Sequence, residues 1–327
     1  MENNYISLLA LVSMILVNSA NQIWRSQEWN SKWDAKWHYK PGDIGGPQQW
    51  GHLYLMSHEN KWMSCNKGHN QSPINISLDK LLYDPMLTPI SVFGGNQSIE
   101  LSIDNMGQDL TASQTSNENI TISGGPLSYS FKFFSLLIKF GSLSSRGSDH
   151  KINGMSFPGE LQFYGFNHEI YDNISHALNK PYGLAAISVF LKIGKTSSDD
   201  LKALIQTAEK CVIKGSQKFL NGLQLSRLMP NVDQYITYPG SLPFPGCDET
   251  VTWIILNQHL DVTESQLKSL RQLKLSISEN SGRMADNFRP IQSLHNRAIR
   301  TNIRLHQQTK ICDFKQDFYY EVNTNSP

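Results

Sequence analysis

Histidines are the first residues to consider, because imidazole is a common ligand of catalytic metal ions. The chain of 327 residues has ten of them, at positions 38, 52, 58, 69, 150, 168, 176, 259, 295 and 306. None forms a His-x-His pair, which would direct two imidazoles to one face of a strand, and none forms a His-Glu-x-x-His motif. Histidine spacing therefore predicts no metal site, and we expect no cofactor.

The cysteines offer a second kind of chemistry. There are four, Cys65, Cys211, Cys247 and Cys312, an even number that fits an oxidising compartment and allows three complete pairings. Cys211 ends an amphipathic segment, where cysteine commonly packs as a small apolar residue, whereas Cys312 lies in a polar stretch. Two hypotheses stay open for these two: they form a bridge together, or Cys312 is available for an intermolecular disulfide with a partner.

Three features indicate secretion. Residues 1–20 resemble a signal peptide, because the apolar run Ile6–Val17 is too short for a membrane span and small residues follow it. Five Asn-x-Ser/Thr sequons occur, and we favour Asn96, Asn119 and Asn173 as glycosylation sites. Asn70 is disfavoured by the nearby Pro73, and Asn75 lies in an apolar stretch that we expect to be buried. No later segment approaches the length of a membrane span, so the mature chain is expected to be soluble and extracellular.

Composition excludes other classes. The formal net charge is +1, from 29 basic and 28 acidic residues without a basic stripe, so no nucleic-acid partner is expected. Hydrophobic residues make up 39% of the chain, with 7 Trp, 12 Tyr and 14 Phe, enough to build a large core.

The elements that would position these residues are mainly strands. β-branched and aromatic runs bounded by Gly, Asn or Ser predict strands at 99–103, 136–140, 160–166, 183–193 and 251–256. Apolar stripes predict surface helices at 198–211 and 263–273. We expect one mixed, mainly β domain over residues 24–305, followed by a polar C-terminal tail over 306–327.

Several motifs, in one order, are similar to those of the α-class carbonic anhydrases. They are Gln71-Ser-Pro-Ile-Asn-Ile76, Gly124-Gly-Pro126, Gly141-Ser-Leu-Ser-Ser-Arg-Gly-Ser-Asp-His150, Tyr238-Pro-Gly-Ser-Leu242 and Asn287-Phe-Arg-Pro290. Asn296-Arg297 and Arg300-Thr-Asn302 make the chain most similar to the tenth and eleventh carbonic anhydrase-related proteins. The resemblance implies a large twisted, mostly antiparallel sheet of about ten strands with short surface helices, and a disulfide between Cys65 and Cys247.

The same resemblance implies that the zinc site is lost. Active members bind zinc through three histidines, two at alternate positions of one strand and one on a neighbouring strand. Those positions correspond to Leu137, Lys139 and Gln162. Leucine has no donor atom, lysine brings a cation, and an amide oxygen is a poor zinc ligand.

The supporting catalytic positions have changed too. Pro243 stands where the family has the threonine that orients zinc-bound hydroxide, and Asp149 replaces its glutamate partner. Gln108, which cannot titrate near neutral pH, stands at the proton-shuttle position, and Phe244 is expected to narrow the pocket. His150 is interpreted as a structural hydrogen-bonding residue, and Lys139 as hydrogen-bonded to Gln162 or water.

These changes predict a catalytically inactive, secreted protein that binds another extracellular or cell-surface protein. The resemblance implies a neuronal, synaptic setting and neurexin-like receptors as candidate partners. The alternative is a residual or altered hydrolase in which Lys139 and Asp149 act in the pocket that holds zinc in active family members. A matrix component without a discrete ligand is a third possibility.

Overall fold

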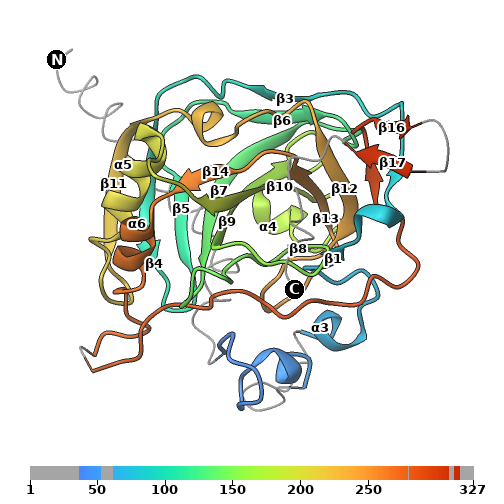
Figure 1. The fold of residues 1–327 in the computed structure, drawn as a ribbon. Helices are drawn as coiled ribbons and strands as arrows, with labels where there is room; N and C mark the ends of the chain where they lie inside the picture. The colour runs from blue at the N-terminus through green and yellow to red at the C-terminus, as the bar shows by residue number, and fades with distance from the viewer. Residues whose placement is uncertain (1–36, 53–61, 279, 309–312, 317–327) are drawn as a thin grey trace, which may run out of the picture.

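Strands rich in β-branched and aromatic residues dominate the part of the chain that the computed structural model describes, residues 37–52, 62–278, 280–308 and 313–316. Thirteen of the described strands form one twisted sheet (Figure 1). Ten of these follow one another in the order β11 (Gln217–Leu223), β4 (Ile99–Asn105), β5 (Leu110–Gln114), β7 (Phe131–Phe140), β9 (Gly159–Asn167), β10 (Leu184–Ile193), β13 (Val251–Leu256), β12 (Tyr235–Gly240), β15 (Arg300–Thr301) and β2 (Leu82–Tyr83).

Three further strands join the sheet beside this path. They are β3 (Ile90–Phe93) and β6 (Thr121–Gly124), which pair with each other next to β7, and β14 (Leu260–Val262), which pairs with β10. Neighbours are antiparallel except for β10 with β13, β10 with β14, and β15 with β2. The prediction of a mainly β fold with a large, mostly antiparallel sheet is confirmed. The resemblance implied about ten strands; ten lie on the main path of the sheet, and β3, β6 and β14 bring the number to thirteen.

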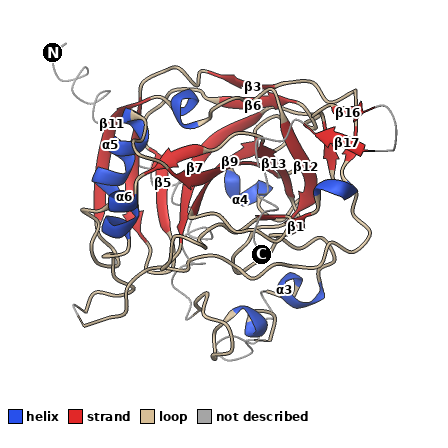
Figure 2. Cartoon of the chain, viewed as in Figure 1, coloured by secondary structure: helices blue, strands red, loops and turns tan. Residues whose placement is uncertain are grey.

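Within the part of the chain that the structure describes, the helices are short and lie outside the sheet (Figure 2). The longest, α5 (Asp199–Ala208), begins at Ser198, whose hydroxyl accepts a hydrogen bond from the Leu201 backbone, and its apolar stripe packs against β11 and β4. Beside it, α6 (Glu264–Leu270) starts with a capping box formed by Thr263 and Gln266. The remaining helices are α3 (Ser64–Lys67), α4 (Ile174–Ala177) and the 3-10 turns η1 (Pro47–Gln49), η2 (Leu78–Lys80) and η3 (Leu225–Leu228).

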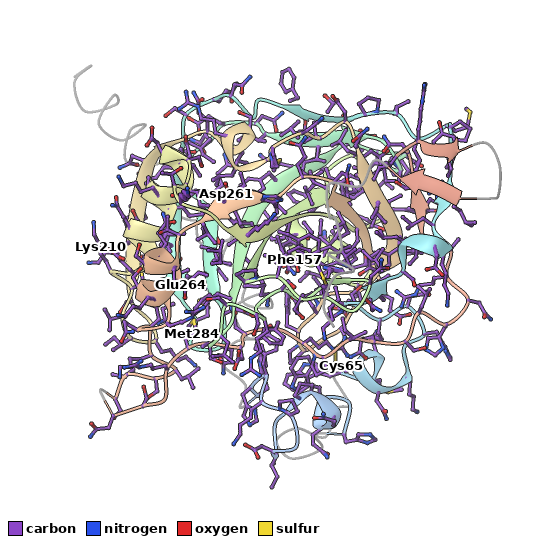
Figure 3. All side chains as sticks on the ribbon, viewed as in Figure 1. Cys65, Phe157, Lys210, Asp261, Glu264 and Met284 are labelled. Atoms are coloured by element: carbon purple, nitrogen blue, oxygen red, sulfur yellow. A yellow bond between two sulfur atoms is a disulfide. The ribbon has the colours of Figure 1, made fainter. Side chains whose placement is uncertain are left out.

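Each face of the sheet has its own apolar core, because side chains alternate along a strand. Leu136, Ile138 and Phe140 of β7 face the core that α5 covers. Leu137 faces the opposite core, which includes Trp37 and Trp50 of the N-terminal arm, residues 37–52. Phe157 belongs to this second core, where it stacks on Phe190, and lies near the centre of the view in Figure 3. The positions of interest lie on the second face.

Two small sheets complete the fold. The parallel pair β1 (Asn75–Ile76) and β8 (Lys151–Ile152) lies outside the main sheet. An antiparallel hairpin of β16 (Leu305–Gln308) and β17 (Asp313–Gln316) occupies part of the segment that we expected as a polar tail. Within the described residues, no helix has the length and apolar character to cross a bilayer.

Candidate functional site

The pairing of β7 with β9 brings the three expected ligand positions together. Leu137 and Lys139 lie two residues apart on β7 and therefore point to the same face. Leu137 is the register partner of Gln162 on β9, so the three side chains share one patch of that face. All three are fully buried. The site is thus an interior cluster, and its chemistry depends on what each side chain contacts there.

The ammonium of Lys139 is held by an acidic partner. Its Nζ lies 2.8 Å from Asp109 Oδ1, donates to the Tyr39 hydroxyl at 2.9 Å, and is 3.7 Å from Asp149 Oδ2. Tyr39 in turn donates to Asp109 Oδ2 at 2.6 Å, and Asn287 Nδ2 donates to Oδ1 at 3.0 Å. Burial raises the pKa of the Asp109 carboxyl, and the neighbouring ammonium opposes that shift. The cation is therefore enclosed by protein groups.

This partner differs from the expected Gln162, because the ammonium of Lys139 bonds to Asp109 and Tyr39. The amide of Gln162 is already engaged: Nε2 donates to Asp149 Oδ2 at 2.8 Å and to Glu160 Oε1 at 3.0 Å. Its Oε1 accepts a hydrogen bond from the Tyr164 hydroxyl at 2.8 Å. Sequence reasoning missed Asp109, because the segment that follows it, Leu110-Thr-Ala-Ser-Gln114, has only two apolar residues and carries no clear strand pattern.

The residues present do not fit a zinc ion. Leu137 offers no donor atom, Lys139 offers a paired cation, and the Gln162 oxygen is taken by Tyr164. Across the described residues, no group of three His, Cys, Asp or Glu side chains is arranged to hold a metal ion.

Asp149 serves as a hydrogen-bond acceptor in the same cluster. Its Oδ1 accepts from the Arg289 backbone at 2.7 Å, and its Oδ2 accepts from Gln162. Burial raises the pKa of Asp149 to about 6, and the Lys139 ammonium opposes this effect. The carboxyl joins β9 to the segment that contains Arg289.

His150 has the structural role expected of it. Its Nδ1 lies 2.8 Å from Glu160 Oε1, its backbone donates to Glu160 Oε2, and its Nε2 lies 2.6 Å from the Tyr238 hydroxyl. Glu160 also accepts from the Ser188 hydroxyl at 2.8 Å. These bonds with His150 hold the pKa of Glu160 below its ordinary value despite burial. All of the ring's polar atoms are used inside the protein.

Pro243, at the position expected for the hydroxide-orienting threonine, and Gln108, at the expected proton-shuttle position, also have other surroundings. Pro243 and Phe244 are buried, and Phe244 belongs to the second core. Gln108 donates from Nε2 to the Trp37 backbone oxygen at 3.0 Å, which ties it to the N-terminal arm. Neither proline nor this glutamine supplies a titratable group.

The expected disulfide between Cys65 and Cys247 is present. It joins α3 to the loop after β12 across 182 residues of sequence. Figure 3 labels Cys65 on α3, beneath the sheet. Cys211 is a free thiol, fully buried, with its Sγ 3.3 Å from the Ile103 backbone oxygen, and burial raises its pKa to about 11. Cys312 falls outside the described residues, in the connection between β16 and β17.

The sequons differ in their surroundings. Asn96 and Asn119 are exposed, and the Asn96 side chain accepts a hydrogen bond from the Ser226 hydroxyl. Asn173 is partly exposed and caps α4 by accepting from the His176 backbone at 3.0 Å. The expectation that Asn75 is buried is wrong: its side chain is exposed because β1 is an outlying strand, and it accepts from the Gly154 backbone.

Two comparisons with known proteins agree with this architecture. Residues 45–303 match the eukaryotic-type carbonic anhydrase family. A carbonic anhydrase-like protein of Caenorhabditis elegans is 37% identical over 287 residues, which cover 85% of this chain and 83% of the nematode protein. The sheet, the motifs and both matches show that the chain belongs to the carbonic anhydrase family.

Proposed function

We propose that this chain is a secreted carbonic anhydrase-related pseudoenzyme that binds an extracellular or cell-surface protein. The observation that carries the proposal is the closed network around Lys139. Carbon dioxide hydration in this family uses a metal-activated water, and that chemistry requires ligands with free lone pairs around an open position. Here a leucine, an ion-paired lysine and an amide already hydrogen-bonded through both its nitrogen and its oxygen stand at the corresponding positions.

The geometry disfavours the alternative of an altered hydrolase. A catalytic lysine must reach the substrate and give up its proton, and a general base needs an accessible carboxylate. Lys139 and Asp149 are both fully buried, and each is bonded to other protein groups. A binding role needs none of these groups to be accessible.

Secretion has independent support. A disulfide that closes a long loop is typical of oxidising compartments, and Cys65–Cys247 is such a bond. The exposed sequons Asn96 and Asn119 suit glycosylation, and Asn173 remains a third candidate. The choice of neurexin-like receptors as candidate partners comes from the resemblance to the tenth and eleventh related proteins.

Cys312 is the candidate for a covalent link to the partner. With Cys65 and Cys247 bridged and Cys211 enclosed, it is the cysteine left for an intermolecular disulfide. It immediately precedes β17, so the hairpin would connect the linkage to the domain.

The test is capture of a neurexin-type receptor ectodomain by the secreted chain, with a carbon dioxide hydration assay on the same preparation. We expect receptor capture and hydration no faster than buffer. A chain retained in the cell would contradict secretion. A secreted chain that does not capture the receptor would contradict the binding proposal. Hydration clearly above buffer would contradict the loss of activity.

A further inference from the structure

A cavity of about 470 Å³ lies between the N-terminal arm and the segment 275–290. Its lining includes His38, Lys40, Gln108, Arg146, Leu275 and Arg283. Leu137, Lys139 and Gln162 do not line it, but Tyr39 and Asn287, which bond to Asp109, do, so the cavity adjoins the Lys139 network without including the former zinc ligands. Figure 3 labels Met284, which lies within the segment that forms one wall. The volume is in the range of cavities that bind small molecules or a few residues of peptide.

Two buried acceptor atoms in the lining have no hydrogen-bond partner among the residues that the structure describes. Gln108 uses Nε2 to donate to the Trp37 backbone, which leaves its Oε1 unpaired. His38 places Nε2 3.1 Å from the Ile44 backbone oxygen, so Nε2 carries the hydrogen and Nδ1 is an unpaired acceptor. A ligand with N–H or O–H donors would satisfy both atoms.

The charges around the cavity favour an anionic group. The lining carries three cations, Lys40, Arg146 and Arg283, against one carboxylate, Asp286. Lys40 is paired with Asp43 at 2.8 Å, and Arg146 with Asp286 at 2.8 Å. Arg283 has no ion pair or side-chain hydrogen bond with another described residue. Its guanidinium is therefore the cation best placed to receive a ligand carboxylate.

An apolar surface adjoins this cation. Leu275 is 42% exposed, and Pro41 and Phe288 also line the cavity. The backbone bridge between Lys274 and Arg283, with the Leu275 N–H bonded to the Gly282 oxygen, holds the leucine and the arginine near each other. A ligand would need an apolar group beside its anion to use both.

We propose that this cavity binds an extended acidic segment of the protein partner, so the inference rests on the proposed function. A carboxylate side chain binds Arg283, main-chain N–H groups donate to Gln108 and His38, and a neighbouring apolar side chain packs on Leu275. A peptide supplies all three features at once. An acidic saccharide supplies donors and an anion but lacks the apolar side chain, so we favour the peptide.

The test uses fluorescein-labelled Gly-Leu-Glu-Leu-Glu-Leu-Gly, its Gln counterpart and a heparin oligosaccharide, each titrated against the full secreted chain by fluorescence anisotropy. We expect the Glu peptide to bind about five-fold or more tightly than the Gln peptide. Arg283→Gln should weaken it by a similar factor, and Leu275→Ser should weaken it because the apolar contact is lost. Arg304→Gln removes an exposed arginine next to β16 and should leave binding unchanged.

Equal binding of the two peptides, or no effect of Arg283→Gln, would overturn the inference. Heparin binding that depends on Arg283, without peptide binding, would overturn the choice of peptide. Receptor capture separates the two proposals. In a Cys312→Ser background, where no covalent link can form, receptor capture by Arg283→Gln equal to that of the Cys312→Ser chain would mean that the cavity inference fails while the binding function stands. Peptide binding without any receptor capture would contradict the choice of receptor and leave the cavity inference supported.

Discussion

The carboxylate of Asp109, which directly precedes β5, lies 2.8 Å from the ammonium of Lys139 on β7, and neither side chain is exposed. Taking two charges out of water is costly, and the cost is offset when their attraction and additional hydrogen bonds are all satisfied. Tyr39 and Asn287 supply those bonds. Lys139, which the family resemblance assigns to a metal-ligand position, is here part of a structural ion pair that couples the sheet to the N-terminal arm.

Lys139→Met should destabilise the fold by about 3 to 5 kcal/mol, because it leaves Asp109 buried without a counterion. Lys139→Met combined with Asp109→Leu should recover much of that loss. Urea unfolding followed by tryptophan fluorescence measures both. The matched control is Arg300→Met, which breaks the exposed pair with Asp84 and should cost less than about 1 kcal/mol. A Lys139→Met variant as stable as the parent chain would contradict the structural role of the pair.

Zinc analysis checks the loss of the metal site. The parent chain should contain no stoichiometric zinc after purification, because Leu137, Lys139 and Gln162 do not provide ligands. The triple variant Leu137→His, Lys139→His, Gln162→His should regain zinc affinity, because the β7–β9 register already brings the three positions together. Hydration should stay slow while Pro243 and Phe244 remain. A folded triple variant that binds no zinc would show that these are not the ligand positions.

The sequence could predict the long strands and the main helices, because each carries a repeated pattern. Val251–Leu256 was predicted with the bounds that β13 has, and α5 lies within the predicted segment 198–211. Strands β2 and β15 have two residues each, and they form because their neighbours align them. The β16–β17 hairpin was missed because its residues are polar and lack an apolar alternation.

The sequence could predict which residues meet at the β7–β9 site, but it could not predict their contacts. The motifs identify Leu137, Lys139 and Gln162, yet the partner of Lys139 comes from 30 residues earlier in the chain. Tyr39 comes from the N-terminal arm, 100 residues away. The packing of three separate segments decides which acidic side chain lies next to the Lys139 ammonium. No local sequence pattern encodes that packing.

Stability should fall as pH rises from about 4 to about 6, through the titration of Asp149. Its pKa is raised from 3.8 to about 6 by burial, so in this window the folded chain binds more protons than the unfolded chain. The stabilisation that comes from protonated Asp149 is fully present below about pH 4 and is lost above about pH 6. Asp149→Asn should flatten this part of the profile, as measured by urea unfolding at a series of pH values. An unchanged slope would contradict the assignment to Asp149.

The disulfide should contribute substantially to stability. It connects residues 182 apart, so opening it enlarges the unfolded ensemble. The double variant Cys65→Ser, Cys247→Ser should lose about 3 to 5 kcal/mol of unfolding free energy. Urea unfolding under non-reducing conditions compares it with the parent chain. Adding dithiothreitol should lower the midpoint of the parent chain and leave that of the double variant unchanged.

The two remaining cysteines should behave differently toward thiol reagents and partners. The Cys211 thiol is enclosed and its pKa is raised to about 11, so it should resist iodoacetamide in the native chain and react only after unfolding. Co-expression with a neurexin-type receptor should give a high-mass adduct on non-reducing gels, which disappears with Cys312→Ser and persists with Cys211→Ser. A Cys211–Cys312 bridge found by peptide mapping in all the secreted chain would rule out the intermolecular link. It would also require the strands around Cys211 to open, because the thiol lies among the apolar side chains that α5 and β4 bury.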